Sequence, residues 1–211
     1  MNSTDKIILW DVDGVLISFN REDPSKDWRR PLLENGMLDY WEGFQRSKFW
    51  ENCLRDKSVD VRDAFHQHLS DLGIAYKDKQ VDEIISIWIN YNTEINDDAL
   101  HTLKKISESG IPCALATNQD GLRALWLRQW VQDNGLNNIG IYISSEIGVA
   151  KPETRFFEKI MALTPPETSQ YIFLDDNIGH IEASRKLGWK AYHVESDFDW
   201  NGFFKEVTIT E

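Results

Sequence analysis

Short runs of consecutive apolar residues recur along the chain and are separated by polar segments. Continuous apolar character is typical of strands that are buried on both faces of a parallel sheet. The runs that predict strands are residues 7–10, 113–116, 139–143, 171–174 and 191–194. Helical spacing, ended in each case by a glycine, predicts helices at residues 97–109, 121–134 and 178–187. This alternation predicts an α/β fold with a doubly wound, Rossmann-like parallel sheet.

The alternation is interrupted between the first and second predicted strands. The connection there is far longer than a crossover helix requires, and such connections usually have structure of their own. Helical spacing of apolar residues recurs in it at residues 42–54, 59–72 and 79–94. Ser58 and Gly73 are the expected start and end signals of the second of these helices. We predict an all-helical cap domain at 19–95, inserted into an α/β core formed by 1–18 and 96–211.

Large aromatic residues are concentrated in the predicted cap. Side chains of this size usually fill a core, although they could also line a substrate pocket. The residues concerned are Trp28, Trp41, Phe49, Trp50, Phe65 and Trp88.

Charge excludes several classes of partner. The formal net charge is -12 and the pI is about 4.9, which disfavours binding to nucleic acid or to anionic membranes. The apolar run before Asp11 is too short for a signal peptide or a membrane span. We therefore expect a cytoplasmic protein, and the sequence does not indicate its oligomeric state.

The cysteines and a histidine pair do not form a recognisable metal site. Cys53 and Cys113 are far apart and are expected to be buried, reduced thiols. His66 and His68 lie two residues apart in a predicted helix and point to different faces.

Polar residues with related chemistry follow four of the predicted strands. Ligands of an open parallel sheet bind beyond the carboxyl ends of its strands, so these residues are candidates for one site. The sets are Asp11-Val12-Asp13-Gly14, Thr117-Asn118, Lys151-Pro152 and Asp175-Asp176. Each set alone also fits a turn, a helix cap or a chance loop sequence. Their occurrence together and in this order favours a functional site.

These residue types meet the needs of phosphoryl transfer. Asp11 can attack phosphorus, and Asp13 can protonate the leaving oxygen and later deprotonate a water. Clustered carboxylates repel each other, so a magnesium ion held by Asp11 and Asp175 is expected.

The remaining residues of the sets suit the binding of a phosphoryl group. Thr117 and Asn118 can donate hydrogen bonds to its oxygens, and Lys151 supplies a compact positive charge. Gly14 allows a sharp turn after the carboxylates and could direct its amide towards phosphate.

The order and spacing of the four sets resemble the haloacid dehalogenase superfamily of phosphohydrolases over nearly the whole chain. That family's helical cap is inserted between its first and second motifs, where the insertion lies here. The resemblance implies a five-stranded core with strand order 5-4-1-2-3. It also implies Asp11 as nucleophile, Asp13 as acid and base, Mg²⁺ ligation by Asp11, Asp175 and the backbone carbonyl of Asp13, and a supporting role for Asp176.

Two positions depart from the family's common pattern. His180 stands where many relatives have Asn, and we expect it on a helix surface, with substrate recognition as the alternative. Glu153-Thr154 replaces an Asp-Pro step after the lysine motif.

The predicted function is a magnesium-dependent phosphatase that acts on a small phosphorylated metabolite through an aspartyl-phosphate. The family's dehalogenases lack a carboxylate at the position of Asp13, since a halide leaves without a proton. Two alternatives remain open at this point: a sugar phosphomutase with the same core residues, and a non-catalytic binding module of the same fold.

Overall fold

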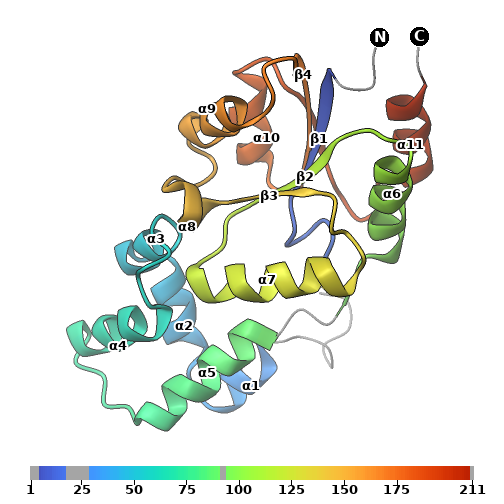
Figure 1. Cartoon of the computed structure of the whole chain (residues 1–211). Coiled ribbons are helices and arrows are strands. Elements are labelled where there is room, and N and C mark those ends of the chain that lie inside the picture. Colours follow the sequence, from blue (N-terminus) through green and yellow to red (C-terminus); the bar gives the residue numbers. More distant parts are fainter. Residues whose placement is uncertain (1–4, 18–28, 91–93, 210–211) are drawn as a thin grey trace.

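A parallel sheet of five strands lies at the centre of the computed structural model, which describes residues 5–17, 29–90 and 94–209 (Figure 1). The strands are β1 (Lys6–Trp10), β2 (Cys113–Thr117), β3 (Gly140–Ile143), β4 (Gln170–Asp175) and β5 (Lys190–His193). Their order is β3-β2-β1-β4-β5, so the predicted fold class and strand order are confirmed. The central strands are almost completely buried, as predicted. The edge strands β3 and β5 are partly exposed, because each has a neighbour on one side only.

Helices cover both faces of this sheet. Successive side chains of β1 point to opposite faces, so Ile8 enters one apolar cluster and Leu9 enters the other. The first cluster contains residues of α6 (Asp97–Glu108), α7 (Gly121–Asp133) and α11 (Trp200–Thr208). The second contains residues of α9 (Thr154–Leu163) and α10 (Ile178–Arg185), and α8 (Ser144–Ile147) follows β3 directly. Helices α6, α7 and α10 begin where the sequence predicts.

The long connection after β1 carries further helices. They are α1 (Arg30–Glu34), α2 (Leu38–Gln45), α3 (Lys48–Cys53), α4 (Val61–Asp71) and α5 (Asp78–Asn90). Together they build an apolar cluster separate from the two at the sheet. We call these helices the cap. The proposed division at 19–95 stays a prediction, and its residues 19–28, Trp28 among them, lie outside the described segments.

Two local predictions in the cap are wrong. The single helix predicted at 42–54 is two helices, because Ser47 has an extended backbone and its hydroxyl caps α3 by accepting from the amide of Trp50. Ser58 does not cap the next helix. Its own amide and hydroxyl bind Asp56, and the carboxylate of Asp60 caps α4 instead.

The aromatic residues of the cap mainly form its core, as predicted. Trp41 and Phe65 are completely buried with ring centroids 5.2 Å apart, and Trp88 packs against Trp41 at 5.5 Å. Phe49 and Trp50 are partly buried against the same cluster. Both free cysteines are buried, also as predicted, and this burial raises the pKa of each thiol to about 12.

The cap sits on the core through specific contacts near the carboxyl ends of the strands. The amide of Lys57 donates to the carbonyl of Ser145 at 3.0 Å, and Arg55 pairs with Glu153 at 2.9 Å. A Cβ atom on Gly121 would lie 2.7 Å from the Lys57 carbonyl oxygen, so glycine permits this close approach. Among the described helices, none has the length and apolar character that crossing a bilayer requires.

Candidate active site

Three charged side chains meet at the carboxyl ends of the neighbouring strands β1 and β4. Asp11 directly follows β1, Asp175 ends β4, and Lys151 reaches between them from the loop after α8. The Lys151 ammonium lies 2.9 Å from Oδ1 of Asp11 and 2.6 Å from Oδ2 of Asp175, and it also donates to the Ala116 carbonyl at 2.9 Å. All three charged side chains are buried. The first, third and fourth sequence motifs therefore share one site.

The electrostatics of this site show a shortage of positive charge. Burial raises the pKa of Asp11 well above its usual value, and the nearby Asp175 raises it further. Burial also acts to raise the pKa of Asp175, but Lys151 and His180 together lower it. Burial acts to lower the pKa of Lys151, but the two carboxylates raise it, so the ammonium stays charged. The single positive charge of Lys151 is thus shared by two buried carboxylates.

A hard divalent cation fits these donors. Carboxylate oxygens of Asp11 and Asp175 lie within 4.8 Å of each other, with the imidazole of His180 beside them. Carboxylate oxygens are the preferred ligands of Mg²⁺, and a second positive charge would offset the repulsion from Asp175, which adds to the effect of burial on the pKa of Asp11. The donor set therefore suits magnesium.

The second motif supports the lysine loop. Thr117 ends β2 and is almost completely buried, and its hydroxyl accepts from the side chain of Gln119 at 3.3 Å. The Asn118 side chain accepts from the amide of Lys151 and donates to its carbonyl, each at 2.9 Å. Asn118 therefore fixes the backbone that carries the lysine, a role that sequence reasoning missed.

Gly14 makes the turn that the sequence predicts, with φ of +87°. Its amide donates to the carbonyl of Ile17 at 2.8 Å, so it stabilises the turn and is not directed at a phosphate. A Cβ atom on Gly14 would lie 2.3 Å from Cγ of Asp176. Glycine is needed here so that Asp176 can approach the first motif. Burial raises the pKa of Asp176, and the negative charge of Asp175 raises it further.

The second carboxylate of the first motif has partners in α7 and in the loop that precedes it. Oδ2 of Asp13 accepts from Nε2 of Gln119 at 2.7 Å, and Oδ1 accepts from Arg123 at 3.3 Å. The motifs in the sequence did not predict a role for Gln119 or Arg123. The helical spacing could have indicated that Arg123 is a buried charge, because Arg123 shares the buried face of α7 with Leu127 and Trp130.

A model of haloacid dehalogenase-like hydrolases matches residues 6–188. The chain belongs to this family. It is 25% identical over 199 residues to a sesquiterpene phosphatase of Aspergillus oryzae, with 92% of each chain covered. It is 27% identical over 197 residues to a phosphatase of Mycobacterium tuberculosis, covering 89% of this chain and 86% of the relative. A HAD family enzyme of Bacteroides thetaiotaomicron, solved with magnesium and inorganic phosphate, superposes with a TM-score of 0.68 at 24% identity, covering 94% of this chain and 98% of that one.

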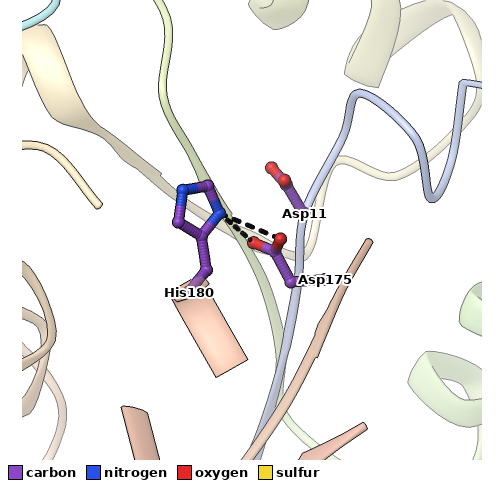
Figure 2. Close-up of side chains that lie close together, drawn as sticks. All are labelled: Asp11, Asp175 and His180. Carbon is purple, nitrogen blue, oxygen red and sulfur yellow. Dashed lines mark hydrogen bonds and ion pairs between the residues drawn. The ribbon is translucent and has the colours of Figure 1, made fainter. Parts of the chain in front are cut away.

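In this member of the haloacid dehalogenase-like family, the prediction that His180 lies on a helix surface is wrong. Nδ1 of His180 lies 2.9 Å from Oδ1 and 3.0 Å from Oδ2 of Asp175, and the imidazole is only 15% exposed (Figure 2). A carboxylate only accepts hydrogen bonds, so Nδ1 carries the proton and donates. The short turn from Asp175 to the Asn177 cap of α10 brings the imidazole back over the strand end.

Removal of the His180 imidazole is expected to weaken Mg²⁺ binding. A side chain that orients a metal ligand typically contributes 10–100-fold in affinity, so we expect a loss of about this size for His180→Ala and a smaller one for His180→Asn. Calorimetric titration with Mg²⁺ measures both, and His101→Ala on the exposed face of α6 is the control. Unchanged affinity in His180→Ala would show that the imidazole does not orient Asp175.

A cavity lies at the amino-terminal end of the sheet, opposite the motif residues. This cavity of about 1060 Å³ is lined by the first residues of β1, β4 and β5 and by α11. Its lysines already hold the last helix, since Lys6 donates to the Val207 carbonyl and Lys190 pairs with Glu206. The motif residues all lie at the other end, which identifies that end as the candidate active site.

Proposed function

We propose that this hydrolase is a magnesium-dependent phosphatase that cleaves a small phosphate monoester through an aspartyl-phosphate at Asp11. The observation that carries the proposal is the buried convergence of Asp11, Lys151 and Asp175. The family match and the phosphatase names of the relatives support it. The magnesium and phosphate bound to the neighbouring B. thetaiotaomicron enzyme also fit it.

The first half-reaction uses two carboxylates in different ways. A carboxylate oxygen of Asp11 forms a bond to phosphorus while the bond to the leaving oxygen breaks, and Asp13 donates a proton to that oxygen. Lys151 places its charge where negative charge develops on the phosphoryl oxygens. Mg²⁺, held by Asp11, Asp175 and the backbone carbonyl of Asp13, would neutralise the substrate phosphate beside the acidic nucleophile.

The second half-reaction restores the nucleophile. Asp13, deprotonated by the first step, takes a proton from a water as that water attacks phosphorus and displaces Asp11. Inorganic phosphate leaves and Asp13 is again protonated. Net release of inorganic phosphate separates this hydrolysis from the transfer that a phosphomutase would catalyse.

The substrate class follows from the family and the cap. The substrate is a small phosphorylated metabolite, and the cap sets which one by closing over the catalytic end of the sheet. A cytoplasmic location remains our prediction.

Magnesium is expected to stabilise the folded protein as well as to support turnover. A ligand at about 100 times its dissociation constant contributes roughly 2.7 kcal/mol to folding, so Mg²⁺ should raise the melting temperature. Asp175→Asn should lose this shift, because it removes a ligand without removing a packing group. Calorimetric melting with Mg²⁺ or with excess chelator measures the shift, and phosphate release from an aryl phosphate measures turnover.

Asp133→Asn is the matched control, since Asp133 is an exposed carboxylate at the end of α7. It should keep the full magnesium-dependent shift. Full turnover of the wild-type protein in excess chelator would end the proposal of magnesium dependence.

A further inference from the structure

Arg123 is a completely buried cation between the cap and the candidate acid and base. It lies on α7, beside α5 of the cap (Figure 1). One terminal nitrogen donates to the Ile89 carbonyl in α5 at 3.1 Å, and the other donates to Oδ1 of Asp13 at 3.3 Å. Its Nε donates to Oε1 of Gln119 at 3.4 Å. A single guanidinium therefore contacts both the cap and the first motif.

We infer that Arg123 is a positioning residue that fixes the orientation of the Asp13 carboxylate when the cap is seated on the core. This inference rests on the proposed function, because it assigns Asp13 the proton transfers. Arg123 acts through Asp13 and does not itself contact the reacting atoms.

The physical argument begins with the charge of the guanidinium. Arginine stays protonated in proteins, so a buried guanidinium must be matched by acceptors or by aromatic faces. Arg123 has both kinds of partner, with its Cζ 4.2 Å from the ring centroid of Trp126 and 5.6 Å from that of Trp88. The planar fork directs its donors along fixed lines. Its position therefore determines where the oxygens of Asp13 can lie.

The other oxygen of Asp13 is held by a residue that Arg123 also contacts. Gln119 donates through Nε2 to Asp13 and accepts through Oε1 from Arg123. This arrangement orients the Gln119 amide, because an inverted amide would place a donor against the guanidinium. Arg123 thus acts on both oxygens of Asp13, directly on one and through Gln119 on the other.

The contacts of Arg123 with the cap are made by the last turn of α5. Its penultimate residue, Ile89, supplies the carbonyl that accepts from Arg123. The preceding residue, Trp88, places its ring near the guanidinium and donates from Nε1 to the Asp120 carboxylate at 2.9 Å. Asp120 is in turn the N-cap of α7. Movement of α5 away from α7 would remove a hydrogen bond from the group that holds Asp13.

The test compares two leaving groups in Arg123→Gln. Phenyl phosphate needs a proton from Asp13 as its bond breaks, whereas p-nitrophenyl phosphate leaves with little help. We expect kcat/KM to fall about 10²-fold for phenyl phosphate, the scale of a misplaced catalytic group, and much less for p-nitrophenyl phosphate. Arg123→Lys should be intermediate, since it keeps the charge but not the fork, and it serves if the glutamine variant does not fold.

Arg128→Gln is the matched control, because Arg128 lies on the same helix and pairs with Glu146 at the surface. It should keep wild-type values with both substrates. Hydrogen exchange of residues 84–90 tests the cap side, and we expect faster exchange in Arg123→Gln only. Equal losses with both substrates, an increase in KM alone, or unchanged exchange at the end of α5 would overturn the inference.

The same experiment separates the inference from the proposed function. Asp13→Asn should show the full effect, with a large loss of kcat/KM for phenyl phosphate and a much smaller loss for p-nitrophenyl phosphate. If it does and the Arg123 variants do not, only the positioning role fails. If the wild-type protein with Mg²⁺ hydrolyses neither phosphate, the proposed function itself fails.

Discussion

Asp11→Asn is expected to abolish both covalent phosphorylation and turnover. The substitution preserves the size of a buried side chain but replaces the attacking carboxylate with a carboxamide, which is not a nucleophile. Incubation with an activated aryl phosphate, followed by an acid quench, should yield no phosphoprotein. Wild-type protein in the same quench should carry label at Asp11.

Asp13→Asn is expected to behave differently, although Asp13 lies only two residues away. Loss of a group that transfers protons typically lowers the rate by about 10²–10⁴-fold. An activated aryl phosphate hardly needs the donated proton, so this variant should form the phosphoenzyme and then stall before hydrolysis. The quench should trap an acid-stable phosphoprotein that hydroxylamine cleaves.

These two variants together test the assignment of the nucleophile. Formation of the same adduct in Asp11→Asn, or labelling of the wild-type protein at another residue, would show that the assignment is wrong. Rapid turnover of poor leaving groups by Asp13→Asn would instead remove Asp13 from the proton transfers.

The sequence predicts the core of this protein well because its signals are local. A buried parallel strand is a short apolar run, and the residue that follows it must lie at the carboxyl edge of the sheet. Asp11 and Asp175 could therefore be placed on one edge before their distance to Lys151 was known. The strand order depends on contacts between distant parts of the chain, so it was predicted only from the family resemblance.

The contacts that sequence reasoning missed depend on tertiary structure. The imidazole of His180 reaches Asp175 because of the turn before α10, and helical spacing alone gives no direction for it. Arg123 appears as one basic residue in a helix, and its partners Asp13 and Ile89 are distant in the sequence. In the cap, apolar spacing continues through Ser47, so the break between α2 and α3 was invisible to a search for periodicity.

Lys151→Met is expected to reduce both stability and activity. The methionine fills much of the same space, but it leaves Asp11 and Asp175 buried without their shared cation. Removing one partner of a buried ion pair typically costs about 3–5 kcal/mol of folding free energy. Removing a preorganised group that stabilises transition-state charge typically lowers kcat by about 10²–10³-fold. Urea unfolding and steady-state hydrolysis of an aryl phosphate measure the two effects.

Magnesium distinguishes the electrostatic cause of this loss from a packing defect. If Lys151 stabilises the fold by balancing the two carboxylates, Mg²⁺ should recover part of the folding free energy of Lys151→Met, because the cation neutralises the same groups. It should not recover kcat, since the charge on the phosphoryl oxygens remains unbalanced. Lys159→Met is the matched control, because Lys159 is partly buried on α9 and donates only to the Ile147 carbonyl among the contacts described for it. Wild-type stability in Lys151→Met without Mg²⁺, or a loss that Mg²⁺ leaves unchanged, would mean that the lysine does not hold the carboxylates together.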